Sequence, residues 1–246
     1  MSIIPESSHC VMSAGEDGQV FMIDLRESKP EKILLLKNEK NKKVPIYSIH
    51  SNPANGNLFC TSGRDQYIRV FDRRFLAREE EGGGQIVKHC PARLRDTDQL
   101  KAYITCAVFS QSGEEVVGSY NDEDIYLFNT GDTEGAEAKR QYQGHRNSAT
   151  VKGVNFYGPE SQFVISGSDC GNIFIWDKES EAIVKLMHGD EAGVVNVLEP
   201  HPTLPVLATS GLDDEVKLWM SVQNYGDDAE AWREKEKEAI MKTVVR

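Results

Sequence analysis

A short pattern of residues returns five times along the chain. Each copy has two small residues, a turn with an aspartate, and a strand-like run that closes on a large apolar side chain. The copies occupy 13–24, 62–72, 119–129, 166–177 and 210–219. Their closing positions, 23, 71, 128, 176 and 219, lie 43 to 57 residues apart. Repeats of this length predict small units that pack on their neighbours and present an interaction surface rather than a catalytic pocket.

Within each copy the run after the turn alternates apolar and polar residues with the period of a β-strand, as in Val216–Trp219. An aspartate stands six residues before the closing position in four copies, where its carboxylate can accept hydrogen bonds from the amides of its own turn. These residues are Asp17, Asp65, Asp122 and Asp213. In the fourth copy Cys170 holds this position and Asp169 precedes it. We therefore expect different turn chemistry there.

Further strand-like runs flank each copy. Two precede the turn, as at 104–109 and 115–117, and one follows the closing position in the first four copies, at 33–36, 85–88, 139–142 and 182–186. We expect one antiparallel sheet for each copy. No such run follows Trp219; instead, residues 229–244 have a helical pattern with an apolar side at Trp232, Ala239 and Ile240.

Composition narrows the functional classes. The 246 residues carry a net charge of −11, which argues against a general nucleic-acid binder. No apolar run is long enough to span a bilayer, and no secretory signal is visible. The five cysteines form no C-x-x-C pair and suggest reduced thiols in an intracellular protein. No catalytic, phosphate-binding or metal-ligand motif is present, so we expect no enzyme, no metal and no cofactor.

The repeats resemble those of the WD-repeat family. Gly144-His145 and Trp176-Asp177 match the two halves of its signature, and Trp219 closes the fifth copy. The resemblance implies an all-β fold, a β-propeller with five recognisable blades over residues 1–222. Their approximate bounds are 1–27, 44–76, 101–131, 145–180 and 181–222, followed by a polar, helical tail over 223–246. Because neither end supplies an outer strand for the fifth blade, we expect the C-terminal part of a larger ring; a closed five-blade ring is the alternative.

Longer stretches are similar to one group of WD-repeat proteins, the cullin-four-associated factors, and most of all to its factor-eight branch. They are 120–129, 144–159, 166–171 and 199–213. The resemblance implies a non-catalytic substrate receptor of a cullin-RING ubiquitin ligase. Its partners would be the damage-specific DNA-binding adaptor, cullin-four and an unknown protein substrate, with no direct contact to nucleic acid or membrane. It would work in the nucleus, the cytoplasm or both.

Proteins of that group dock on the adaptor through a Trp-Asp-x-Arg box, often doubled on adjacent blades. The sequence has two Asp-x-Arg matches, Asp24 with Arg26 and Asp72 with Arg74, preceded by Ile23 and Phe71 in place of tryptophan. The guanidinium group is a rigid, weakly hydrated fork of donors that suits an interface. Alternatively, each pair is a salt bridge within its own blade, and the chain is a general WD-repeat scaffold without ligase docking.

Overall fold

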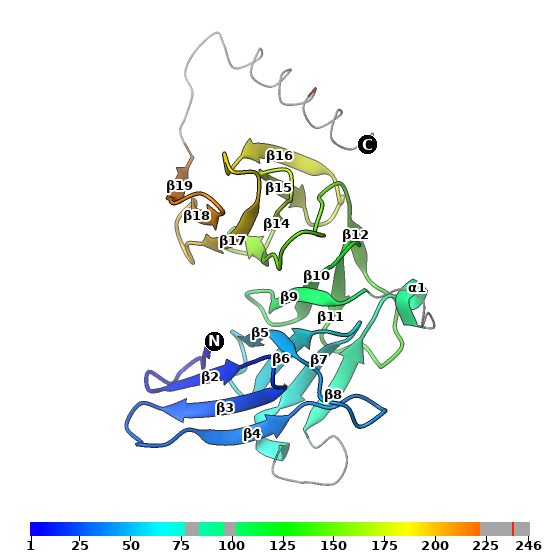
Figure 1. Ribbon diagram of the computed structural model, residues 1–246, viewed down its shortest axis with the longest axis vertical. Helices are drawn as coiled ribbons and strands as arrows, with labels where there is room; N and C mark the ends of the chain where they lie inside the picture. Colours follow the sequence, from blue (N-terminus) through cyan, green and yellow to red (C-terminus); the bar gives the residue numbers. More distant parts are fainter. Residues whose placement is uncertain (77–83, 96–101, 222–237, 239–246) are drawn as a thin grey trace. The chain divides into compact units, whose positions relative to one another are not determined.

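The computed structural model describes residues 1–76, 84–95, 102–221 and 238 (Figure 1). Its strands form antiparallel sheets, one for each copy of the repeat, so the predicted all-β fold is confirmed. By its internal contacts the chain divides into two compact units, 1–139 and 140–246, and each is described by itself. No helix in the described part of the chain has the length and apolar character to cross a membrane.

Unit 1 holds the first three sheets, drawn from blue to green in Figure 1. The first sheet contains β1 (Ser2–Ile3), β2 (Cys10–Ala14), β3 (Gln19–Asp24) and β4 (Glu31–Leu35) in that order. The second contains β5 (Ile46–Ser51), β6 (Leu58–Gly63), β7 (Ile68–Asp72) and β8 (Gln85–His89). The third contains β9 (Ile104–Phe109), β10 (Glu115–Tyr120) and β11 (Ile125–Asn129). A 3-10 helix, η1 (Arg73–Phe75), follows β7, and α1 (Ala92–Arg95) follows β8.

Unit 2 begins with the short strand β12 (Arg140–Tyr142). The fourth sheet contains β13 (Val154–Tyr157), β14 (Phe163–Gly167), β15 (Asn172–Asp177) and β16 (Ile183–His188). The fifth contains β17 (Val195–Pro200), β18 (Val206–Gly211) and β19 (Val216–Met220). The predicted helical tail lies outside the described residues except for Glu238, which is helical. The size of the ring and the blade bounds stay predictions.

One pairing is common to all five sheets. The closing residue of the repeat lies opposite an apolar residue of the preceding strand. The pairs are Ile23 with Val11, Phe71 with Phe59, Phe128 with Val116, Trp176 with Val164, and Trp219 with Leu207. Because a slip of one residue would turn every side chain to the other face of its sheet, this pair fixes the register of each repeat.

The small residues of the pattern allow a close approach of backbones. A Cβ atom on Gly63 would lie 1.9 Å from the carbonyl oxygen of Pro45, and one on Gly167 would lie 2.1 Å from that of Val195. A Cβ atom on Gly211 would lie just as close to the carbonyl oxygen of Val194. Gly63 and Gly211 therefore let the chain that enters one strand pass directly over the end of the next strand, and Gly167 lets β17 of the fifth sheet approach the end of β14 in the fourth.

Sheet-on-sheet packing forms the core of unit 1. Met12 and Val20 of the first sheet pack with Phe59 and Phe71 of the second, and the two phenylalanine rings stack with centroids 5.3 Å apart. The opposite face of the second sheet, with Ile68 and Val70, packs on the third through Ala107, Phe109 and Val116. Both faces of the second sheet are thus buried, and all five residues of β7 are buried, Arg69 and Asp72 included.

The core of unit 2 follows the same rule. Ile165 and Ile173 of the fourth sheet are fully buried against Leu198 and Leu207 of the fifth, with Trp219 packed at the margin.

The five cysteines of the chain are free, and Cys60 and Cys90 are buried. Burial raises the pKa of the Cys60 thiol far above its ordinary value.

Candidate partner-binding site

The first Asp-x-Arg turn begins where β3 ends. The Asp24 carboxylate accepts the backbone amide of Arg26 at 3.0 Å and also binds its guanidinium group, with Nε donating to Oδ1 at 2.9 Å and Nη2 to Oδ2 at 2.6 Å. The turn is tied to the neighbouring loop because Leu25 donates its amide to the carbonyl of His9 at 2.8 Å. Local hydrogen bonds therefore hold this arginine in one position.

The second turn repeats this geometry at the end of β7. Asp72 accepts the amide of Arg74 at 3.0 Å, and the guanidinium Nε and Nη2 donate to its carboxylate at 2.9 and 2.6 Å. Asp72 is also the N-cap of η1, which explains why a helical turn forms here. Two adjacent sheets of unit 1 thus carry the same ion pair at the same end of the same strand.

The two carboxylates and the two guanidinium groups differ in exposure. The Asp72 side chain is buried and that of Asp24 is partly buried, whereas the Arg26 and Arg74 side chains are 67% and 58% exposed. The hydrogen bond from Arg26 holds the pKa of Asp24 well below its ordinary value, and Arg74 lowers the pKa of Asp72 in the same way. No hydrogen bond from Nη1 of either arginine reaches another described residue. Each turn therefore offers outward donors on a fixed cation.

Apolar side chains accompany these cations. Leu25, between Asp24 and Arg26, is largely exposed. Phe75 is 42% exposed, and its ring centroid lies 5.5 Å from the guanidinium carbon of Arg74. An arginine beside exposed apolar surface is a composition that protein interfaces favour. The arrangement has the chemistry of a docking surface for a protein.

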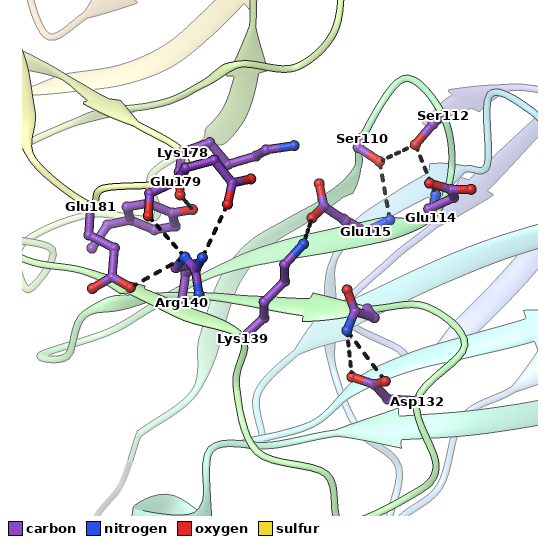
Figure 2. A network of polar contacts seen from close by, with 12 residues as sticks. Ser110, Ser112, Glu114, Glu115, Asp132, Lys139, Arg140, Lys178, Glu179 and Glu181 are labelled. Atoms are coloured by element: carbon purple, nitrogen blue, oxygen red, sulfur yellow. Dashed lines mark hydrogen bonds and ion pairs between the residues drawn. The ribbon is translucent and has the colours of Figure 1, made fainter.

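The equivalent turns of the other sheets are built differently. In the third sheet Asn129 replaces the aspartate, and its Nδ2 donates to Asp132, which is labelled in Figure 2. In the fourth sheet Asp177 accepts the amide and hydroxyl of Ser180 at 2.8 and 2.6 Å. In the fifth sheet Met220 holds the position and is largely exposed. Among the described residues the guanidinium-bearing turn is thus confined to the first two sheets.

Basic side chains near these other turns are engaged elsewhere (Figure 2). In unit 1, Lys139 forms an ion pair with Glu115 of β10. In unit 2, Arg140 donates to the carbonyl and carboxylate of Glu179, both at 3.1 Å, and lies 3.7 Å from a carboxylate oxygen of Glu181. The turn after Asp177 therefore presents acidic groups that already bind a cation.

The repeat aspartates take several roles. In three of them the carboxylate accepts the backbone amide of the residue two positions later, at 3.0 to 3.3 Å. These are Asp17, Asp65 and Asp213. Asp122 differs, because its backbone has a φ of 56° and its carboxylate accepts Nδ2 of Asn121 at 2.9 Å. In the fourth copy Asp169 reaches a different loop and accepts the amides of Ser148 and Ala149 at 2.7 and 3.1 Å.

The signature residues of the fourth and fifth copies are packing residues. Trp176 is fully buried, its Nε1 donates to the carbonyl of Gln143 at 2.9 Å, and its ring meets that of His145 edge-on with centroids 5.7 Å apart. Trp219 donates its Nε1 to the hydroxyl of Thr209 at 2.9 Å. These contacts place His145, Trp176 and Trp219 inside their repeats rather than on a binding surface.

Sequence analysis missed three buried polar residues. Arg69 binds Asp65 from within β7, Lys152 forms an ion pair with Asp169, and Asp190 accepts the amides of Leu212 and Asp213 at 2.8 and 3.1 Å. The Arg69 pair could have been found from its i, i+4 spacing across the turn. The partners of Asp190 lie too far along the chain for any local signal. No cluster of His, Cys, Asp and Glu in the described ranges is placed to hold a metal ion.

Comparison with known proteins supports the repeat assignment. A family model described as "WD domain, G-beta repeat" matches residues 35–72 and 136–177, which include the second and fourth copies. Human "WD and tetratricopeptide repeats protein 1" is 40% identical over 136 residues, covering 50% of this chain and 20% of that protein. These two stretches therefore match WD40 repeats.

Two further relatives match shorter stretches. Human "DDB1- and CUL4-associated factor 6" is 49% identical over 86 residues, covering 35% of this chain and 10% of that protein. The "WD repeat protein iqw1" of Schizosaccharomyces pombe is 49% identical over 80 residues, covering 32% of this chain and 10% of that protein. The chain spans a fifth or less of the length of these relatives, and the resemblance to the factor-eight branch stays a prediction.

Proposed function

Since two stretches of the chain match WD40 repeats, we propose that the chain is a non-catalytic substrate receptor of a cullin-four ubiquitin ligase. The doubled Asp-x-Arg turn would dock on the damage-specific DNA-binding adaptor, which joins the receptor to cullin-four. A protein substrate would bind elsewhere on the repeats. Such a receptor works inside the cell, in the nucleus or the cytoplasm, and needs no cofactor of its own.

The observation that carries this proposal is the identical placement of Arg26 and Arg74. Both follow the third strand of their sheets, both form an ion pair with the aspartate two residues earlier, and both side chains remain more than half exposed. A guanidinium group that is already oriented loses little conformational freedom when a partner binds its remaining donors. The relative named "DDB1- and CUL4-associated factor 6" adds support, because its name connects a similar repeat chain with this adaptor and cullin.

A general scaffold without ligase docking is the second candidate. The observation in its favour comes from the same ion pairs. Each aspartate already neutralises the charge of its arginine within one turn, so no partner is needed for that purpose. Exposed pairs of this kind add little to stability. Loss of an arginine would then change neither folding nor the binding of an adaptor.

The two candidates separate in a binding measurement with the purified adaptor. Titration calorimetry would compare the full chain with its Arg26→Ala, Arg74→Ala and doubly substituted variants. We expect each single change to weaken binding about tenfold, equivalent to ~1.4 kcal/mol, and the double change to abolish it in the measurable range. Circular dichroism would verify that all variants fold alike.

Arg73→Ala is the matched control. Arg73 is exposed in the same 3-10 helix as Arg74, but its Nε donates to Asn57 at 3.2 Å and it has no counterpart in the first turn. This variant should bind the adaptor as the unsubstituted chain does. If the folded, unsubstituted chain fails to bind, or if the double variant binds equally well, docking through these turns is wrong and the scaffold interpretation stands.

A further inference from the structure

A short hairpin between the first two sheets of unit 1 concentrates positive charge. Residues 37–43 follow β4 and extend beyond its end in Figure 1, and four of these seven residues are exposed lysines. They are Lys37, Lys40, Lys42 and Lys43. Because the whole chain has a net charge of −11, this segment is a positive site on an acidic protein. We call it the basic hairpin.

The tip of the basic hairpin is held by one side chain. Oδ1 of Asn38 accepts the backbone amides of Lys40 and Lys42 at 3.0 and 2.9 Å, and the Asn38 amide donates to the carbonyl of Lys42 at 2.8 Å. Asn41 adopts a φ of 57°, a left-handed conformation that asparagine tolerates in tight turns. Local hydrogen bonds therefore fix the hairpin backbone, which lowers the entropic cost of binding a partner.

The base of the hairpin places two like charges opposite each other. Leu36 and Val44 are buried on either side of the hairpin, and the Val44 amide donates to the carbonyl of Leu36 at 3.1 Å. The next pair outward is Lys37 and Lys43, which form an antiparallel bridge. Like charges in directly opposite positions of two strands destabilise the pairing. An anionic group that binds both ammonium groups would relieve this repulsion.

Acidic residues of unit 1 neutralise little of this charge. Glu39 lies within the hairpin, but its carboxylate forms an ion pair with Lys88 of β8 at 2.8 Å. The adjoining turn contains the exposed Glu16 and Asp17, and the Asp17 carboxylate accepts the amide and the side chain of Gln19 at 3.0 and 2.5 Å. Within the part of the chain that the structure describes, none of the four hairpin lysines lies within ion-pair distance of a carboxylate.

The basic hairpin and the first Asp-x-Arg turn lie at opposite ends of the first sheet. Leu35, next to the hairpin, pairs with Gln19 at the start of β3, whereas the turn with Arg26 follows the last residue of this strand, Asp24. The six residues of β3 separate the two ends by roughly 20 Å. A short segment bound to the hairpin would therefore leave Arg26 accessible to the adaptor.

We propose that the basic hairpin is a docking site for an acidic segment of another protein, rich in aspartate or glutamate. Lysine ammonium groups are compact point charges that can each pair with a single carboxylate. A nucleic-acid duplex or an anionic membrane extends well beyond this hairpin and would bring its phosphates against the acidic remainder of the chain, whereas a short peptide contacts the hairpin alone. The identification of the acidic protein as the receptor's substrate rests on the proposed function; the docking itself does not.

Fluorescence anisotropy of the full chain with a short labelled peptide of alternating glutamate and serine tests this proposal. We expect binding that weakens as the salt concentration rises. The Lys37→Gln/Lys43→Gln variant should bind about fivefold to tenfold more weakly, as expected for the loss of two exposed ion pairs. Lys29→Gln/Lys32→Gln is the matched control, because it removes two exposed lysines near the opposite end of β4, and it should bind like the unsubstituted chain.

Urea unfolding and adaptor titration separate docking from other effects. The Lys37→Gln/Lys43→Gln variant should be as stable as the unsubstituted chain or slightly more stable, because the change removes the repulsion across the bridge. Its affinity for the adaptor should be unchanged. Loss of adaptor docking in the Arg26 and Arg74 variants, or its absence from the unsubstituted chain, would therefore leave the peptide result standing.

Several results would overturn the proposal. A peptide that fails to bind the full chain, or that binds the Lys37→Gln/Lys43→Gln variant just as tightly, excludes the hairpin as a site for acidic peptides. Equal weakening in the Lys29→Gln/Lys32→Gln control would mean that only the net charge of the chain matters. Tighter, hairpin-dependent binding of a DNA duplex or of vesicles that contain phosphatidylserine would assign the surface to nucleic acid or to a membrane instead.

Discussion

Arg69 and Asp65 form a two-point ion pair in the second sheet, with Nη1 donating to Oδ1 at 2.9 Å and Nη2 to Oδ2 at 2.6 Å. Unlike Arg26 and Arg74, Arg69 is buried, with a side chain only 6% exposed. A buried cation that loses its partner is strongly destabilising, whereas an exposed one is not.

Asp65→Ala should therefore lower the free energy of unfolding by about 3 kcal/mol, because it leaves the Arg69 guanidinium buried without a counterion. Urea unfolding followed by circular dichroism measures this change. Asp24→Ala removes the same kind of contact from an exposed arginine and should lower the free energy of unfolding much less. Equal losses for the two variants would mean that burial does not govern the strength of these pairs.

Gly167→Ala should destabilise the chain by about 2 kcal/mol or more, since the added methyl group would overlap the carbonyl of Val195 and force the two strands apart. Gly131 offers a control because nothing lies within 4 Å of a Cβ at that position. Gly131→Ala should leave the urea midpoint unchanged or raise it slightly. A Gly167→Ala variant as stable as the Gly131→Ala variant would contradict the close approach described for the repeat.

The burial of His50 predicts that the free energy of unfolding depends on pH. Burial lowers its pKa to about 4, and its Nδ1 accepts the amide of Phe109 at 3.1 Å, so the folded chain holds the neutral ring. The unfolded ring has an ordinary pKa of about 6.5. Its contribution to stability is therefore complete above pH ~6.5 and is lost as the pH falls toward 4, with a slope of up to ~1.4 kcal/mol per pH unit.

The variant His50→Asn keeps an acceptor near the Phe109 amide but does not titrate. Urea midpoints measured from pH 7 to pH 4 should fall less steeply for this variant than for the unsubstituted chain. His9→Asn, at an exposed histidine, should retain the original slope. An unchanged slope in His50→Asn would show that another group, such as the similarly buried His89, controls this range.

Trp176→Phe should cost about 1–2 kcal/mol, and Trp176→Ala about 3–5 kcal/mol. The first change removes the donor to the Gln143 carbonyl, and the second also leaves a cavity beside Phe174, whose ring stacks on the indole at 5.4 Å. Thermal unfolding of both variants would give the order of stability. A phenylalanine variant as damaged as the alanine variant would assign the main role to the hydrogen bond.

The strands could be predicted from sequence because their signal is local. Alternation with a period of two and a closing residue such as Phe71 or Trp176 are visible in any window of a few residues, and the observed registers follow them. The Asp-x-Arg geometry is also local, because donor and acceptor stand two residues apart. Both features are therefore contained in short stretches of the chain.

Other features depend on packing between distant segments. Asp190 serves the turn at Leu212, and Lys152 meets Asp169 from a different loop. Nothing near Asp190 in the sequence predicts these partners. The sequence likewise does not predict the left-handed backbone of Asp122. Its carboxylate accepts a hydrogen bond from Asn121 and not from the turn amides.

The order of the strands has a consequence for synthesis. Within each sheet, hydrogen bonds join strands that follow one another in the sequence, from β1–β4 to β17–β19. A nascent chain can therefore complete one sheet soon after its last strand has left the ribosome, before the next repeat exists. Pairing between near neighbours also keeps loop closure inexpensive in entropy and favours rapid formation of each sheet. The order of synthesis then sets the order of assembly. The sheet face with Met12 and Val20 forms first, and Phe59 and Phe71 pack on it once the second sheet has been synthesised.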